Sequence, residues 1–316
     1  MKTNFPSAGL IKKASERIRP FINLTPVLTS STIDRMFGAN IFFKCENFQK
    51  VGAFKARGAT NAVRSLDPVS LNKGVATHSS GNHAQALAWA AGLAGTKAYI
   101  VMPSNSSPVK VGAVKGYGGR ITFCEPTLPS REATLLRVIE ETGAVEVHPY
   151  NDNRIIAGQA TSALELIEEI KDLDIILAPV GGGGLLSGTA LSAYYFSPGT
   201  CVIAAEPEQA DDARRSFVSK TFVESVNPQT IADGLRTSLG SLTFPIIREH
   251  VSDIVTVSEG SIVEAMKFIW ERMKIIVETS SAVPFAAILE NTIQVKGKRI
   301  GIILSGGNVD LNNLPW

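Results

Sequence analysis

The sequence predicts an α/β fold built around mainly parallel sheets. Short apolar runs recur along the chain without strict alternation, which is typical of strands buried on both faces of a parallel sheet. Helix-like stretches separate these runs, and glycine-rich loops follow several of them. Alternating strands and helices favour right-handed crossovers, so we expect ligands to bind beyond the carboxyl ends of the strands.

The elements follow one another in a regular order. The apolar runs predicted as strands are Ile41–Cys45, Val75–His78, Ala98–Met102, Arg120–Cys124, Ile175–Val180, Cys201–Ala205 and Arg299–Leu304. The helical stretches predicted between them include Gln85–Leu93, Arg131–Glu141, Ala157–Ile170 and Ile262–Lys274. We predict linkers at Asp67–Lys73 and His148–Asn153. They would separate a large domain, residues 1–70 and 150–316, from a small inserted domain, residues 71–149.

Composition limits the classes of function. The chain has 316 residues, enough for two domains, and 31 Lys and Arg against 29 Asp and Glu, so we expect no nucleic-acid partner. No apolar run is long enough to span a membrane, and the polar N-terminal stretch lacks a signal-peptide core. Three widely spaced cysteines argue against a disulfide framework and a thiolate zinc site. We therefore expect a cytoplasmic protein.

A run of glycines, Gly181 to Gly184, directly follows the apolar segment DIILAPV and precedes a helix-like stretch. Converging backbone N–H groups at a helix N-terminus favour an anion, most plausibly a phosphate. A tight turn is the simpler alternative, but it needs fewer glycines. Glu206 follows about 20 residues later, as in a dinucleotide-binding unit. Leu186 and Ser187 stand where GxGxxG requires its last glycine.

Two further motifs lie at predicted helix starts. The segment Ser79–His83, SSGNH, follows one strand, and its polar groups could cap the next helix or face a ligand. Lys55 opens another helix directly after Phe54. A helix N-terminus and partial burial both disfavour the ammonium form. Lys55 is therefore a candidate for Schiff-base chemistry, although most lysines are merely solvated.

Two polar segments follow later strands. Ser305 begins the segment SGGN after the last strand, which places it at the predicted site edge or in a plain C-terminal turn. The segment Glu206–Asp212 holds several carboxylates that could bind a hard divalent cation. Taken alone, the residues favour a solvated acidic loop there.

Together these motifs resemble the fold type II family of pyridoxal-phosphate enzymes, in particular its serine racemase and serine/threonine dehydratase branch. The segments that carry the resemblance are ENFQKVGAFKARGATNAV, THSSGNHAQALAWAA, PVGGGGLLSGTAL, AAEPEQADDA, TIADGL, ERMK and LSGGNVDL. They cover essentially the whole chain. The resemblance implies two open, twisted, mainly parallel sheets with flanking helices, a large domain with a smaller inserted one, and a homodimer. No regulatory domain after Asn308, and so no feedback by isoleucine, is expected.

The resemblance also implies roles, position by position. Lys55 and Ser80 are implied to be the catalytic acid–base pair on opposite faces of a pyridoxal 5′-phosphate cofactor. The implied cofactor-binding residues are Phe54, Lys55, Asn82, Gly181, Gly182, Gly183, Gly184, Leu185, Gly234 and Ser305. The implied substrate-binding residues are Ser79, Ser80, Gly81, Asn82, His83, Arg131 and Thr237. Glu206, the Ala210 carbonyl and Asp212 are implied to bind a divalent cation, Mg²⁺ or else Ca²⁺ or Mn²⁺, which reverses the preference for a solvated loop.

The implied activity is the elimination of water from L-serine or L-threonine, giving a 2-oxo acid and ammonia, with or without racemisation of serine. A threo-3-hydroxyaspartate ammonia-lyase of the same family is the alternative. Two other classes stay open on the residues alone. The glycine loop and Glu206 allow a nicotinamide-dependent oxidoreductase, and a catalytically idle protein that binds a small molecule is also consistent with the motifs.

Overall fold

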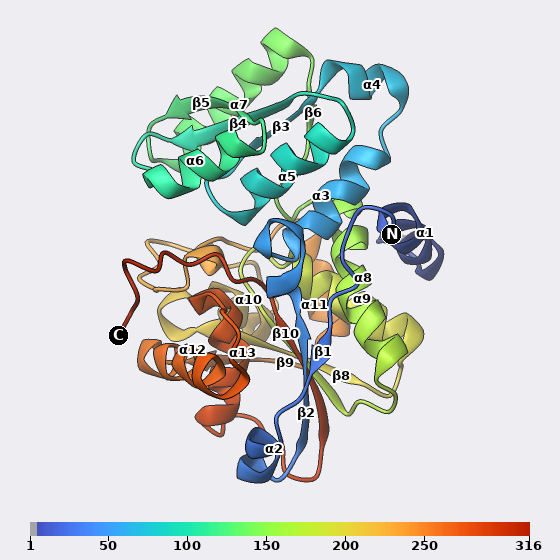
Figure 1. The fold of residues 1–316 in the computed structure, drawn as a ribbon, viewed down its shortest axis with the longest axis vertical. Coiled ribbons are helices and arrows are strands. Elements are labelled where there is room, and N and C mark those ends of the chain that lie inside the picture. The colour runs from blue at the N-terminus through green and yellow to red at the C-terminus, as the bar shows by residue number, and fades with distance from the viewer. Residues whose placement is uncertain (1–4) are drawn as a thin grey trace.

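The computed structural model describes residues 5–316, whose strands form two separate sheets. Figure 1 shows the smaller sheet and its helices above the larger sheet. Helix α3 (Lys55–Arg64) lies between them and packs against α5 (Asn82–Leu93) and α8 (Asn153–Glu169). The predicted α/β class is therefore confirmed, and α3 carries Lys55 into the region between the two sheets.

The larger sheet has the strand order β1-β2-β10-β7-β8-β9. Its strands are β1 (Val27–Leu28), β2 (Asn40–Cys45), β7 (Ile175–Pro179), β8 (Cys201–Pro207), β9 (Asp253–Val257) and β10 (Arg299–Leu304). Neighbouring strands run parallel except β1, which pairs antiparallel with β2. All side chains of β7 are buried, which explains why its sequence is apolar without alternation.

The smaller sheet has the strand order β5-β4-β3-β6, and all its neighbours run parallel. Its strands are β3 (Val75–His78), β4 (Ala98–Pro103), β5 (Arg120–Cys124) and β6 (Val145–Glu146). These strands lie within residues 71–149, the segment expected to form the small domain. The exact domain boundaries stay a prediction.

The helices other than α3, α5 and α8 are α1 (Ala8–Ile18), α2 (Ser31–Phe37), α4 (Pro68–Lys73), α6 (Pro108–Gly116), α7 (Leu128–Thr142), α9 (Gly184–Phe196), α10 (Asp212–Ser219), α11 (Thr243–His250), α12 (Glu259–Met273) and α13 (Thr279–Leu289).

Helices cover both faces of the larger sheet. Ile175 and Leu177 of β7 share a buried cluster with α12 and α13, whereas Ile176 and Ala178 share one with α8 and α9. Because successive strand side chains point to opposite faces, these helix pairs lie on opposite faces of the sheet.

Most predicted elements are present, with ends shifted by a few residues. The predicted linker Asp67–Lys73 contains a short helix, α4, and the Asp67 carboxylate caps it by accepting hydrogen bonds from the N–H groups of Val69 and Ser70. Strands β1, β6 and β9 are absent from the predicted set, and β1 and β6, at two residues each, are too short to stand out as apolar runs. Among the described residues, no helix combines the length and the apolar character needed to cross a bilayer.

Candidate active site

Lys55 begins α3 beside the carboxyl end of β10. The Phe54 N–H donates to the Ser305 carbonyl (3.0 Å), which fixes the start of the helix. The Lys55 Nζ donates to the Pro149 carbonyl oxygen (2.8 Å) and lies 5.1 Å from the centre of the Phe54 ring. Burial lowers the pKa of Lys55 from 10.5 to about 8, although the nearby Glu278 carboxylate opposes this shift. The side chain is thus much closer to a neutral, nucleophilic amine at physiological pH than an exposed lysine is.

The glycine run lies between β7 and α9, and it needs glycine for two separate reasons. Gly183 has a φ of +85°, a conformation that L side chains rarely adopt. A Cβ atom on Gly182 would lie 2.3 Å from the Tyr150 ring, so only glycine fits beneath this ring. The backbone N–H groups of residues 181–185 donate to no other group among residues 5–316. This turn therefore offers several free N–H groups at a helix N-terminus to an anion.

The segment Ser79–His83 connects β3 to α5 and contains half-buried polar groups. The Ser79 N–H donates to the Val101 carbonyl (3.0 Å), and the Gly81 N–H faces the Ser79 hydroxyl (3.4 Å). The Ser80 hydroxyl makes no hydrogen bond to any residue in the range 5–316. The loop is therefore anchored by its first residue, while Ser80 stays available to a ligand.

His83 is buried beneath this loop with its Nε2 3.0 Å from the Val147 carbonyl. A carbonyl only accepts hydrogen bonds, so Nε2 carries the proton and Nδ1 is an acceptor. Nδ1 is buried and has no partner among the described residues. Burial and then the Lys55 charge hold the pKa of His83 well below its usual range, so the ring is neutral.

A buried carboxylate, Glu278, lies at the centre of the polar groups and was not predicted from the sequence. Its Oε1 accepts a hydrogen bond from the Asn82 side-chain amide (3.0 Å), and its Oε2 accepts one from the Asn308 N–H (3.2 Å). The Asn308 side chain also donates to the Asn82 Oδ1 (2.9 Å). Burial raises the pKa of Glu278 to about 7, and Asp233 adds to this rise. Glu278 therefore orients Asn82 through a network that joins α5 to the segment after β10.

The structure brings Phe54, Ser305 and Gly234 close to Lys55 and the glycine run. Ser305 is 3% exposed and accepts the Phe54 N–H through its carbonyl. Gly234 lies in the 3₁₀ turn η4 (Asp233–Leu235), and its carbonyl oxygen would be 3.2 Å from a Cβ atom on Gly181. Its N–H donates to the Ser280 hydroxyl (3.1 Å). Sequence segments from both ends of the chain thus meet around one lysine.

Within residues 5–316, no hydrogen bond or ion pair links Arg131 or Thr237 to Lys55 or to the glycine run. Arg131 lies on α7, where it adds to the lowering of the His78 pKa that burial causes, and its Nε is buried without a partner among the described residues. Thr237 is exposed after η4 and makes no hydrogen bond within residues 5–316. Asp233, in the turn η4, forms an ion pair with Lys110 of α6 (2.6 Å). This ion pair connects η4 to a helix that lies among the elements of the smaller sheet.

The acidic segment Glu206–Asp212 contains two buried carboxylates, and that of Glu206 accepts hydrogen bonds from backbone N–H groups. The Glu206 oxygens accept hydrogen bonds from the N–H groups of Ala213 (2.9 Å) and Arg214 (2.8 Å) at the start of α10. Both oxygens of Asp212 are buried and have no hydrogen bond of ordinary geometry to any described residue, although the nearby Ser225 hydroxyl favours the charged form. Burial raises the pKa of Asp212 to about 6 and that of Glu206 well above its usual range. No group of three or more His, Cys, Asp or Glu side chains suited to a metal occurs in residues 5–316.

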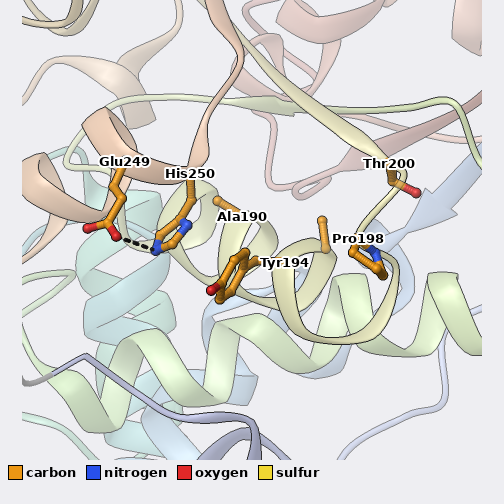
Figure 2. Close-up of a pocket in the computed structure, with 7 residues that line it drawn as sticks. Ala190, Tyr194, Pro198, Thr200, Glu249 and His250 are labelled. Carbon is orange, nitrogen blue, oxygen red and sulfur yellow. Dashed lines mark ion pairs between the residues drawn. The ribbon is translucent and has the colours of Figure 1, made fainter.

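A surface cavity of about 300 Å³ lies elsewhere, between α9 and the end of α11. Figure 2 shows Tyr194 and the Glu249–His250 pair (3.9 Å) at this cavity. None of the predicted site residues lines it. Its position therefore separates it from the polar groups around Lys55.

Comparison with known proteins supports the resemblance. Residues 18–306 match the profile of the family described as pyridoxal-phosphate dependent enzyme. The chain is 54% identical over 303 residues to a beta-hydroxyaspartate dehydratase of Paracoccus denitrificans, covering 96% of each chain, and 52% identical to a serine racemase of Arabidopsis thaliana, covering 96% of this chain and 93% of that one. The crystal structure of serine racemase from Dictyostelium discoideum superposes with a TM-score of 0.93 at 50% identity, covering 96% of this chain and 99% of that chain. These matches confirm the predicted fold and family.

Proposed function

Because this chain belongs to the family of pyridoxal-phosphate-dependent enzymes, we propose that it eliminates water from a 3-hydroxy amino acid, with racemisation of serine as a second activity. Elimination leaves an enamine, the 2-aminoacrylate or its substituted form, which water hydrolyses to a 2-oxo acid and ammonia. The observation that carries this proposal is the buried lysine with its lowered pKa. Its Nζ donates to the Pro149 carbonyl, next to the Tyr150 ring that packs on the glycine run, and its charge lowers the pKa of His83 in the loop Ser79–His83.

The residues present fit the cofactor. The free N–H groups of residues 181–185 suit its phosphate, and Lys55 suits its aldehyde carbon. Asn82 and Ser305 would hold the oxygen and the nitrogen of the ring, with Phe54 and Gly234 on either side of it. Bound pyridoxal phosphate supplies an electron-accepting ring that stabilises negative charge at the substrate α-carbon.

The chain's own residues supply binding and proton transfer. The loop Ser79–His83 would hold the substrate carboxylate through its backbone N–H groups and side chains, with Arg131 and Thr237 at the edge of the substrate site. Lys55, as a neutral amine, would take the proton from the α-carbon, and Ser80 would exchange a proton at the same carbon from the other face. General acid–base placement of this kind contributes about 10²–10⁴-fold in rate.

A second candidate substrate is threo-3-hydroxyaspartate. Two observations favour it: the guanidinium of Arg131 has a buried Nε without a partner among the described residues, and one relative at 54% identity is named a beta-hydroxyaspartate dehydratase. A nicotinamide cofactor is not favoured, because residues 18–306 match the pyridoxal-phosphate family and the glycine run lacks the last glycine of GxGxxG.

Supplying the protein with pyridoxal phosphate and each candidate substrate tests the proposed function. We expect 2-oxo acid and ammonia from L-serine, L-threonine or threo-3-hydroxyaspartate, and the ranking of kcat/KM identifies the preferred one. Release of neither product from any of the three, or turnover that requires a nicotinamide, contradicts the proposal.

Replacing Ser80 by alanine should separate the two activities. We expect L-to-D conversion of serine, and elimination from D-serine, to fall more than elimination from L-serine, because only the first two need a proton transfer on the face opposite Lys55. Chiral chromatography of the products from each enantiomer measures the difference. Equal losses for both enantiomers would show that Ser80 is not the second acid–base group.

The proposal includes a divalent cation held by Glu206, the Ala210 carbonyl and Asp212. Asp212 supports it, because both its oxygens are buried and, with the Ser225 hydroxyl nearby, have no hydrogen bond of ordinary geometry to any described residue. A cation would remove the repulsion between these carboxylates, and oxygen ligands suit Mg²⁺, Ca²⁺ or Mn²⁺.

Addition of Mg²⁺ should therefore stabilise the chelator-treated protein. At 100 times its Kd the cation adds about 2.7 kcal/mol to the free energy of unfolding. Thermal melting measures this gain. Glu206→Gln should reduce the response, whereas Glu208→Gln, an exposed acid of the same segment, should retain it. Identical melting with and without Mg²⁺ would leave the acidic segment as a solvated loop.

We further propose a homodimer in the cytoplasm. Several large apolar side chains are exposed, including Tyr194 on α9 (56% exposed), Val218 on α10 (66%) and Val226 (73%). Contact with a second subunit would remove such side chains from water. The three free cysteines, of which Cys201 is exposed, suit a reducing compartment. Sedimentation equilibrium at twice the chain mass is the expected result.

A further inference from the structure

The turn formed by residues 148–151 connects the smaller sheet to α8, and the imidazole of His148 organises it. The His148 Nδ1 accepts hydrogen bonds from the backbone N–H groups of Tyr150 (3.3 Å) and Asn151 (2.9 Å). The His148 ring also meets the Tyr150 ring edge to face, with centroids 4.6 Å apart. One side chain therefore fixes both the backbone of the turn and the aromatic ring that it carries.

This turn contacts two parts of the cofactor site at once. The Pro149 carbonyl accepts the hydrogen bond from the Lys55 Nζ (2.8 Å). The Tyr150 ring packs on the glycine run so closely that a Cβ atom on Gly182 would lie 2.3 Å from it. A shift of the turn would therefore move the acceptor for Lys55 and the packing behind the phosphate site together.

The role of His148 requires a neutral ring. Nδ1 accepts two N–H groups, so it holds a lone pair and the proton is on Nε2. Burial lowers the pKa of His148 to about 4, with further contributions from His78 and Lys55, while Asp152 opposes the shift. These groups and the Tyr150 ring face the imidazole. Protonation would place a third N–H at a point where two already converge, so the turn is stable with neutral His148 at physiological pH.

We propose that His148 is a positioning residue, which acts on Lys55 and on the glycine run through the turn 148–151 and does not touch the substrate. This inference rests on the proposed function, because Lys55 and residues 181–185 are taken as the cofactor site. A positioning role predicts a specific chemical requirement: a hydrogen-bond acceptor at the place of Nδ1. Asparagine supplies one, because its Oδ1 is attached to Cγ as Nδ1 is, and asparagine commonly accepts from the backbone two residues ahead.

The test compares His148→Leu, which removes the acceptor, with His148→Asn, which keeps it. Asp67→Leu is the matched control, because the Asp67 carboxylate accepts from the N–H groups two and three residues ahead in the same way, at α4 and outside the site. Three readouts are taken. They are the Kd of pyridoxal phosphate for the cofactor-free protein, the pH midpoint at which an amine reagent labels Lys55 in that form, and kcat against KM.

We expect His148→Leu to weaken cofactor binding, to shift the labelling midpoint of Lys55, and to lower kcat by about 10²-fold, the loss typical of a small misplacement of a reacting group. His148→Asn should recover most of each loss. Asp67→Leu should lower thermal stability but leave all three readouts unchanged. The proposal is overturned if His148→Leu matches the wild type, if His148→Asn is no better than His148→Leu, or if Asp67→Leu shows the same losses. Cofactor binding and labelling do not depend on turnover, so they decide the role of His148 even if every candidate substrate fails.

Discussion

Lys55→Ala should abolish elimination and racemisation while leaving the chain folded. Lys55 is the proposed base at the α-carbon and the proposed covalent attachment point, so the variant loses both contributions. Loss of the base alone is expected to cost about 10²–10⁴-fold in rate. The measurement is 2-oxo acid release with pyridoxal phosphate in excess. Borohydride reduction followed by peptide mapping should find the cofactor attached at residue 55 in the wild type only.

The fold should tolerate this change because burial of Lys55 is unfavourable for its charged form. The pKa is lowered from 10.5 to about 8, so below pH 8 the folded protein holds a proton that burial disfavours. This cost decreases as the pH rises from about 8 to 10.5, where the unfolded chain binds more protons than the folded one. Removing the amine removes the cost, so we expect no fall in the melting temperature at neutral pH.

Lys50→Ala is the matched control for this experiment. Lys50 is exposed and precedes Lys55 on the same segment, so its removal changes the net charge equally without reaching the site. Wild-type turnover is expected for it. Turnover by Lys55→Ala at the wild-type rate would contradict the role assigned to Lys55, and an unfolded variant would contradict the expected tolerance of the fold.

The sequence predicts the parts of the site that are marked by several residues together. The glycine run and the Ser79–His83 loop each follow a buried strand, so parallel topology places each of them at the carboxyl edge of its own sheet. Lys55 is marked by its position at a helix start, which local chemistry makes unusual for a cation. The fold is predicted for the same reason, because fully buried strands leave continuous apolar runs.

The sequence does not predict Glu278, His148 or Tyr150 as site residues, because no neighbouring residues form a recognisable motif with any of them. Glu278 is a single acid before α13, and nothing in the adjacent sequence indicates that Asn82, 196 residues earlier, donates a hydrogen bond to it. His148 lies in a segment predicted only as a linker, and its acceptor role depends on local backbone geometry. Strands β1 and β6 have two residues each, too few to show any periodicity.

Arg57→Met should strongly destabilise the folded chain. Arg57 is fully buried two residues after Lys55, and its guanidinium donates to Glu46 Oε2 (2.7 Å) and to Glu165 Oε1 (2.7 Å). Lys44 is also fully buried and pairs with Glu165 (2.7 Å). Two cations and two carboxylates therefore balance one another where β2, α3 and α8 meet.

Removing Arg57 leaves the Glu46 carboxylate buried without its main partner. Breaking a buried pair on one side costs about 3–5 kcal/mol of unfolding free energy, because the remaining charge is desolvated and unpaired. Burial would raise the pKa of Glu46, but the Arg57 charge and hydrogen bond hold it below the usual value. The stabilisation from Glu46 is thus present above its unfolded pKa of about 4.3 and is lost as the pH falls through the lower folded pKa.

Chemical denaturation at several pH values tests this network. We expect the deficit of Arg57→Met to be largest near neutral pH and smaller near the pKa of Glu46, because a protonated glutamic acid no longer needs the cation. Arg57→Met combined with Glu46→Gln should recover part of the loss, since no carboxylate then stays unpaired at that position. Arg35→Met, at an exposed arginine of α2, should change the free energy by no more than about 0.5 kcal/mol. A deficit independent of pH, or a double variant less stable than Arg57→Met, would show that the cost comes from packing of the side chain and not from the unpaired carboxylate.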